Sequence, residues 1–206
     1  MATKNRLFMI MKRREFILAM FTLALFVVLC LTTNFSSAVG LQSYLKDVSY
    51  ILVAAVAMTM LFLTGNTDLS MGTTLGLAGF FSAQLAKSGA QWYLYIPLAI
   101  GVAVLFSGIN GVIVTVFKVP PMVASLALMT VHMGLFTLMP AGGWVENMPA
   151  HFTNIGYATV GVFLPLIFVI AVVVFAICVL FMKYSPFSKK IYAVGGNRNA
   201  TILAGI

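Results

Sequence analysis

The stretch from 64 to 72 reads Thr64-Gly65-Asn66-Thr67-Asp68-Leu69-Ser70-Met71-Gly72. It is a polar, glycine-bounded break between two apolar runs, 49–63 and 71–86. As a helix, each run would be roughly 24 Å long, which is short of the ~30 Å hydrocarbon core of a bilayer. Asp68 is therefore expected at or near membrane depth, where an ionisable side chain usually faces a water-filled path or the inside of a bundle. Short, interrupted apolar segments also indicate the substrate pathway of a transporter.

The composition indicates an integral membrane protein. The chain is 62% hydrophobic and only 8% charged, and its long apolar runs lack strict alternation. This pattern favours membrane helices over a soluble fold or a membrane barrel. We predict an all-α, polytopic protein in which residues 1–206 form a single membrane-embedded domain. About six transmembrane helices are expected, at 16–31, 49–63, 71–86, 92–117, 122–138 and 160–182.

The basic residues predict the orientation of these helices. If the tail 1–15 is cytoplasmic and every run crosses once, ten of the twelve Lys and Arg residues are cytoplasmic, as the positive-inside rule asks. If 49–86 were one broken span, the count would fall to six or seven. The break is therefore placed toward the cytoplasm, with an outer loop at 139–159 and a cytoplasmic segment at 183–206. Trp92, Tyr93 and Tyr95 are expected in the outer interfacial aromatic belt.

The start of the chain permits a second interpretation. The basic tail, the first apolar run and Ser36-Ser37-Ala38 together resemble a signal peptide with a small-residue cleavage site. Cleavage there would not change the orientation of the later helices.

The sequence offers little for catalysis, metal or nucleotide binding. It holds four acids and two histidines, no His/Cys cluster and no glycine-rich phosphate loop. We therefore expect no enzymatic activity and no cofactor. The net charge of +8 comes from residues beside the ends of apolar runs, so it predicts membrane topology rather than nucleic-acid binding.

Several polar residues inside the apolar runs each have two interpretations. Asp68 either caps the following helix or hydrogen-bonds a polar solute, and Asn66 and Ser70 would help to shape or gate that path. His132 is either a bonded structural residue or a proton relay. Asn110 either bonds a neighbouring helix or lines the pathway, while Gly108 and Gly111 would let a neighbouring helix approach closely.

The end of the chain predicts a short cytoplasmic helix. Gly195 and Gly196 precede Asn197, a suitable N-cap, and Gly205 is a suitable stop after a helix that contains Arg198, Asn199 and Ala200. A short helix bracketed by glycines suits the docking of a soluble partner. Alternatively, it only opens the next segment.

At these places the chain resembles the permease subunits of bacterial ABC importers for ribose and other monosaccharides. Their Gly-Gly-x-Asp-Leu-Ser-x-Gly motif reads here Gly65-Asn66-Thr67-Asp68-Leu69-Ser70-Met71-Gly72. Asn110-Gly111, Lys118 and Pro120-Pro121 match a second motif, and a third, cytoplasmic motif begins at Gly195-Gly196-Asn197. The pair before Ala200 is usually acidic in that family, and here it is Arg198-Asn199.

The resemblance implies a subunit that moves a monosaccharide across the inner (plasma) membrane. Its implied partners are an ATP-binding subunit on the coupling helix, an extracytoplasmic sugar-binding protein, a second permease chain and membrane lipid. Family permeases continue past this helix, so we expect a chain that is incomplete at its C-terminus. Alternatives are import of another polar solute, such as a signalling sugar derivative or a polyol, a secondary carrier or channel, and a non-transporting scaffold.

Overall fold

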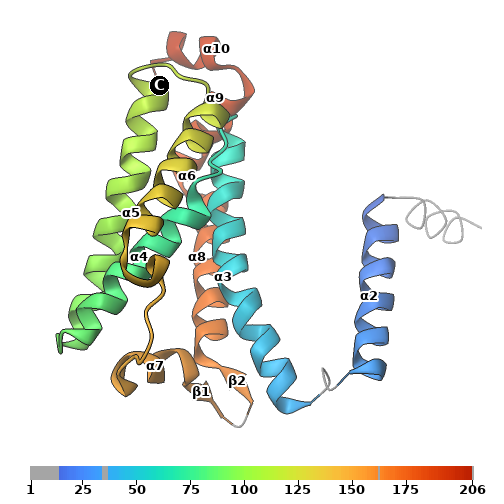
Figure 1. Ribbon diagram of the computed structural model, residues 1–206. Helices are drawn as coiled ribbons and strands as arrows, with labels where there is room; N and C mark the ends of the chain where they lie inside the picture. Colours follow the sequence, from blue (N-terminus) through green and yellow to red (C-terminus); the bar gives the residue numbers. More distant parts are fainter. Residues whose placement is uncertain (1–13, 34–36, 162, 206) are drawn as a thin grey trace, which may run out of the picture. The chain divides into compact units, whose positions relative to one another are not determined.

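The computed structural model describes residues 14–33, 37–161 and 163–205, and it divides into two units (Figure 1). The first unit is Met1–Asp47 and the second is Val48–Ile206. Most of the basic tail, Ser36 of the possible cleavage site and the final Ile206 lie outside the described residues.

The first unit contains α2 (Arg14–Thr32) and the beginning of α3 (Ala38–Leu63). The ring of Phe26 meets that of Tyr44 edge-on, with centroids 6.4 Å apart. Helix α3 begins eleven residues before the predicted start at Ser49, so the prediction of a short segment there is wrong. With 26 residues, α3 is about 39 Å long and can cross a bilayer.

Most of the described chain is helical, which confirms the all-α membrane class. Four helices are long and apolar enough to cross a membrane: α3, α5 (Trp92–Thr115), α6 (Pro121–Leu138) and α8 (Leu166–Tyr184). Helix α4 (Met71–Lys87) has 17 residues, and the apolar part of α2 is equally short. Six crossings therefore stay a prediction.

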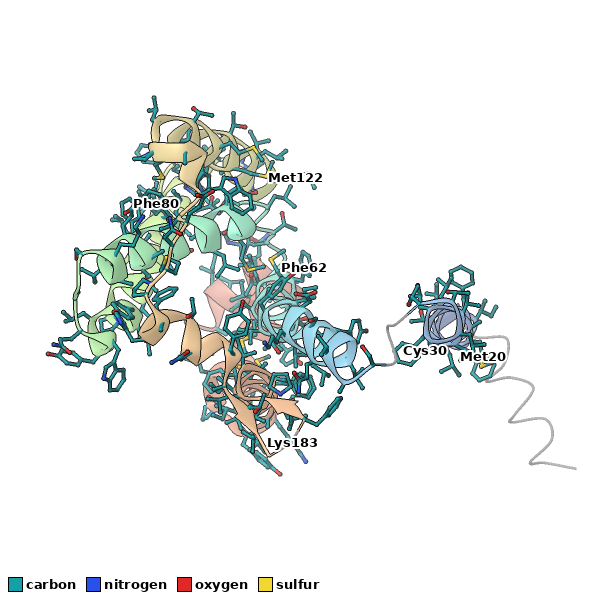
Figure 2. The ribbon with its side chains drawn as sticks, turned by 60° about the horizontal axis from the view of Figure 1, so that its bottom comes forward. Met20, Cys30, Phe62, Phe80, Met122 and Lys183 are labelled. Carbon is teal, nitrogen blue, oxygen red and sulfur yellow. The ribbon has the colours of Figure 1, made fainter. Side chains whose placement is uncertain are left out.

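Helices α4, α5 and α6 pack together and hold most of the buried side chains of the second unit. Small residues on α4, such as Ala78 and Ala83, allow this close approach, and Leu77 is fully buried. Figure 2 shows Phe80 within this group, whereas Phe62 and Lys183 lie on α3 and α8. Between α3 and α8 lies an apolar groove of about 450 Å³.

The connection between α6 and α8 packs against the start of α5. It contains a 3-10 turn, η2 (Pro140–Gly143), and the helix α7 (Ala150–Tyr157). Tyr95 stacks on His151 and meets Phe152 edge-on, and its hydroxyl donates to the carbonyl oxygen of Ala90 (2.8 Å). Tyr95 is thus buried, while Trp92 and Tyr93 are exposed, and the place of all three in an interfacial aromatic belt stays a prediction.

The last predicted span begins later than expected. Strands β1 (Thr159–Val160) and β2 (Leu164–Pro165) pair antiparallel, and α8 starts only at Leu166. After α8 come α9 (Pro186–Gly196) and α10 (Arg198–Leu203). These two helices lie at the end of the second unit where α3 and α5 also end (Figure 1).

Candidate functional site

The break between α3 and α4 is held by short hydrogen bonds within its own residues. The Asn66 amide donates to the hydroxyl of Thr64 (2.9 Å). One carboxylate oxygen of Asp68 accepts from both the backbone N–H (2.8 Å) and the hydroxyl (2.6 Å) of Ser70, which is fully buried. Gly65 turns the chain with a φ of +81°, a conformation that favours glycine.

Asp68 does not cap α4 in the predicted way. The N-cap of α4 is Ser70, whose side chain bonds no first-turn amide, and the carbonyl of Ser70 accepts from Thr74 N (2.9 Å). Asp68 instead fixes the conformation of Ser70 from two residues upstream. It orders the entry to α4, because a carboxylate that accepts two hydrogen bonds holds both donors in place.

The C-terminal segment lies directly against this break. A Cβ added at Gly195 would overlap the carbonyl oxygen of Leu63 and come within 3.4 Å of Thr64 Cα. The backbone of α9 therefore approaches the last turn of α3 more closely than any other residue type allows. At Gly196 the same atom would meet nothing within 4 Å.

A pocket of about 420 Å³ joins the break to the α5–α6 connection and to α10. Its lining includes Asn66 from the break, Lys118 from the connection, and Arg198 and Asn199 from α10. Lys118 has a φ of 57°, which is uncommon for a residue with a side chain. Three segments that the sequence singled out separately thus meet at one end of the second unit.

The predicted cap of the last helix is confirmed. The side chain of Asn197 accepts from the backbone N–H of Ala200 (3.0 Å), and its carbonyl accepts from Thr201 N (3.0 Å). The helix ends at Leu203, and Gly205 follows with a φ of +76°.

A second polar group lies inside the α4–α5–α6 packing. His132 is fully buried; its Nδ1 lies 3.0 Å from the hydroxyl of Thr73, and its ring meets Phe106 edge-on. Among the described residues, three buried polar atoms have no hydrogen-bond partner: His132 Nε2, Asn110 Oδ1 and Thr74 Oγ1. The interhelical bond expected from Asn110 is therefore not made through its oxygen.

Gly108 and Gly111 lie on the same helix as Asn110 but are exposed. A Cβ at either position would meet nothing within 4 Å among the described residues. A packing role for these glycines stays a prediction that needs a neighbour from another chain or segment.

Sequence reasoning missed two parts of the site. It did not expect α9, although Ser185 and Pro186 are a typical helix start and the Ser185 hydroxyl accepts from Phe187 N (3.1 Å). It also missed Thr73, whose pairing with His132 joins helices far apart in sequence and has no local signal. The backbone of α9 touches Leu63 and Thr64 at the start of the break. A displacement of α9 and the following α10 can therefore be transmitted to the break.

Comparison of the sequence with known proteins finds a matching family and several relatives. A family described as "Branched-chain amino acid transport system / permease component" matches residues 40–206. The ribose import permease protein RbsC of Haemophilus influenzae is 32% identical over 202 residues, which are 96% of this chain and 61% of that protein. RbsC of Bacillus subtilis is 30% identical over 184 residues, 87% of this chain and 56% of that protein.

A more distant relative has a different named substrate. The autoinducer 2 import system permease protein LsrC of Yersinia enterocolitica is 26% identical over 198 residues and is matched over 55% of its length. The chain thus spans little more than half the length of these curated relatives. No solved structure matches. Since the family match covers most of the chain and the helices are those of a membrane protein, this chain belongs to the permease-component family of membrane transport systems.

Proposed function

We propose that this chain is a permease subunit of an ATP-driven (ABC) importer that carries a monosaccharide across the inner membrane. The relatives named as ribose import permeases support a sugar, and LsrC, which is named for the import of autoinducer 2, supports another polar solute as the alternative. A neutral sugar needs hydrogen-bonding groups rather than charges. Asn66, Asp68 and Ser70, which lie together in the break, would shape or gate its path.

The observation that carries this proposal is the contact between Gly195 and the end of α3. An ATP-binding subunit docked on α9–α10 would move these helices when it closes on nucleotide. Because the backbone of α9 touches Leu63 and Thr64, that motion would reach the break directly. Alternating access requires such a two-state element, biased by a ligand at a distance.

In this proposal all six apolar helices cross the membrane and the N-terminus is cytoplasmic. The break, Lys118 and α9–α10 then face the cytoplasm, and α7 faces the extracytoplasmic sugar-binding protein. A second permease chain completes the pore. ATP hydrolysis belongs to the separate ATP-binding subunit.

Copurification with an ATP-binding subunit of a ribose importer tests the docking assignment. Gly205→Pro should reduce its recovery, because proline cannot adopt the positive φ that follows α10. Gly161→Pro is the matched control, since Gly161 also has a positive φ (+67°) but lies between β1 and α8. Unchanged recovery with Gly205→Pro, or an equal loss with Gly161→Pro, would remove the assignment.

A further inference from the structure

Residues at the end of α5 and just after it line two depressions, of which only the first contains charged side chains. The first is the pocket of about 420 Å³ that contains Lys118 and Arg198. The second is a groove of about 490 Å³ on α5, which extends from Val104 past Gly108 to Phe117 and is lined only by apolar residues. Phe117 in the groove precedes Lys118 in the pocket, so the two surfaces are continuous along the chain.

The groove is long enough to cross the hydrocarbon part of one leaflet of a bilayer. The thirteen residue steps from Val104 to Phe117 correspond to about 20 Å along a helix. One leaflet contributes about half of the ~30 Å hydrocarbon core. With Lys118 at the interface, the groove therefore follows α5 through the acyl region of the same leaflet.

The charge of the pocket indicates its ligand. Of the described residues that line it, two are basic and none is acidic. Lys118 and Arg198 come from segments that are eighty positions apart in the sequence. Two cations at the membrane interface attract an anion, and basic pockets beside membrane helices on the cytoplasmic side suit lipid headgroups.

We infer that these depressions form a binding site for a phospholipid with an anionic headgroup. Its phosphate lies between Lys118 and Arg198, and one acyl chain lies in the groove on α5. The inference rests on the cytoplasmic placement of this end in the proposed function and does not depend on which solute is transported. A bound lipid would join α10 to the α5–α6 connection.

Native mass spectrometry of the full chain, released from phosphatidylcholine vesicles with a minor fraction of phosphatidylglycerol, tests the site. The variants are Lys118→Asn, which tolerates the left-handed backbone, Arg198→Gln and their combination. Each single variant should retain about fivefold less phosphatidylglycerol, and the pair roughly 25-fold less, because each cation near an anionic surface contributes comparably. Lys189→Gln with Lys190→Gln is the matched control, since both residues lie on α9 outside the pocket.

Gly108→Leu tests the groove without changing any charge. A Cβ added at Gly108 meets nothing within 4 Å among the described residues, so leucine should extend into the groove, leave the helix content unchanged and lower phosphatidylglycerol retention. Inorganic phosphate is the competing probe. Displacement of bound phosphatidylglycerol by millimolar phosphate, with no effect of Gly108→Leu, would indicate a free-phosphate site and overturn the lipid assignment.

Three other results would also overturn it. An equal loss with the α9 control would indicate general attraction to the membrane. A change of oligomeric state with Gly108→Leu, at constant lipid retention, would make the groove an interface between two copies. Loss of the ATP-binding subunit with Lys118→Asn, at constant lipid retention, would assign the pocket to that partner. If only the lipid site is wrong, the ATP-binding subunit should still copurify with the chain. The lipid proposal and the proposed function can therefore be rejected independently.

Discussion

At the scale of single residues, Gly195 is the position where the structure differs most from what the sequence alone suggests. In the sequence, Gly195 is one of two adjacent glycines that precede the short docking helix. In the structure it lies in the last turn of α9, where its missing side chain leaves room for the Leu63 carbonyl. Its neighbour Gly196 has open space, so the two glycines differ although the motif treats them alike.

We therefore expect Gly195→Ala and Gly196→Ala to have opposite effects. The first forces α9 away from α3 and should lower the free energy of unfolding by about 1–3 kcal/mol, as overpacking does. The second should be neutral or raise it by roughly 0.5–1 kcal/mol, because alanine restricts the unfolded chain and favours a helix. Thermal unfolding of the purified variants in one detergent measures both. Equal melting temperatures would show that α9 does not press on α3.

Asp68 allows structural and solute-binding roles to be separated. Asp68→Ala removes the acceptor for both Ser70 donors and should destabilise the protein by about 1.5–3 kcal/mol. Asp68→Asn keeps an acceptor oxygen, so it should retain most of the stability and most of the sugar uptake in cells that supply the partner subunits. An Asp68→Asn protein that melts normally but transports nothing would instead assign the carboxylate to the solute path.

At the scale of elements, the apolar runs predicted the existence of α4, α5 and α6 and nearly all of their bounds. The predicted helix boundaries were wrong where a helix extends into polar residues or where apolar residues are not helical. Helix α3 continues upstream through Lys46 and Asp47, since a helix can leave the apolar layer without ending. Val160 and Leu164 are paired in two short strands, and apolarity alone cannot distinguish such a strand pair from the start of a helix.

The candidate site shows the same division between local and long-range signals. Asn197 was recognisable because a cap depends on its own helix. The meeting of Asn66, Lys118 and Arg198 in one pocket depends on how α3, α5 and α9 end relative to one another. The distribution of basic residues predicted that these segments lie on one side of the membrane, but their contact could be found only in the packed structure.

The packing of α4 on α6 provides a further prediction. Thr73→Val is nearly isosteric but removes the only hydrogen bond of the buried His132 ring among the described residues. We expect a loss of about 1–3 kcal/mol in the free energy of unfolding, the cost of an unsatisfied buried polar group. Thr130→Val on α6 is the control, because its hydroxyl bonds its own helix at Leu126 and is exposed. Equal melting temperatures for the two variants would contradict a structural role for this pair.

At the scale of the whole molecule, the proposed topology depends on α4 crossing the membrane despite its 17 residues. A helix of that length is about 25 Å long, so the bilayer must thin locally or neighbouring helices must shield its ends. The buried face of α4 supports shielding, because it packs on α5 and α6.

Cysteine labelling in intact cells tests this crossing. With Cys30 and Cys178 replaced by alanine, single cysteines at Thr67 and Ser88 mark the two ends of α4. A membrane-impermeant maleimide should label Ser88→Cys and Trp144→Cys from outside. It should label Thr67→Cys and Asn199→Cys only after permeabilisation, because the break and α10 line one pocket at the cytoplasmic end.

External labelling of Asn199→Cys would reverse the orientation and remove the docking proposal. Labelling of Thr67→Cys and Ser88→Cys from the same side would instead make α4 a re-entrant segment, which the positive-inside distribution of the later loops opposes.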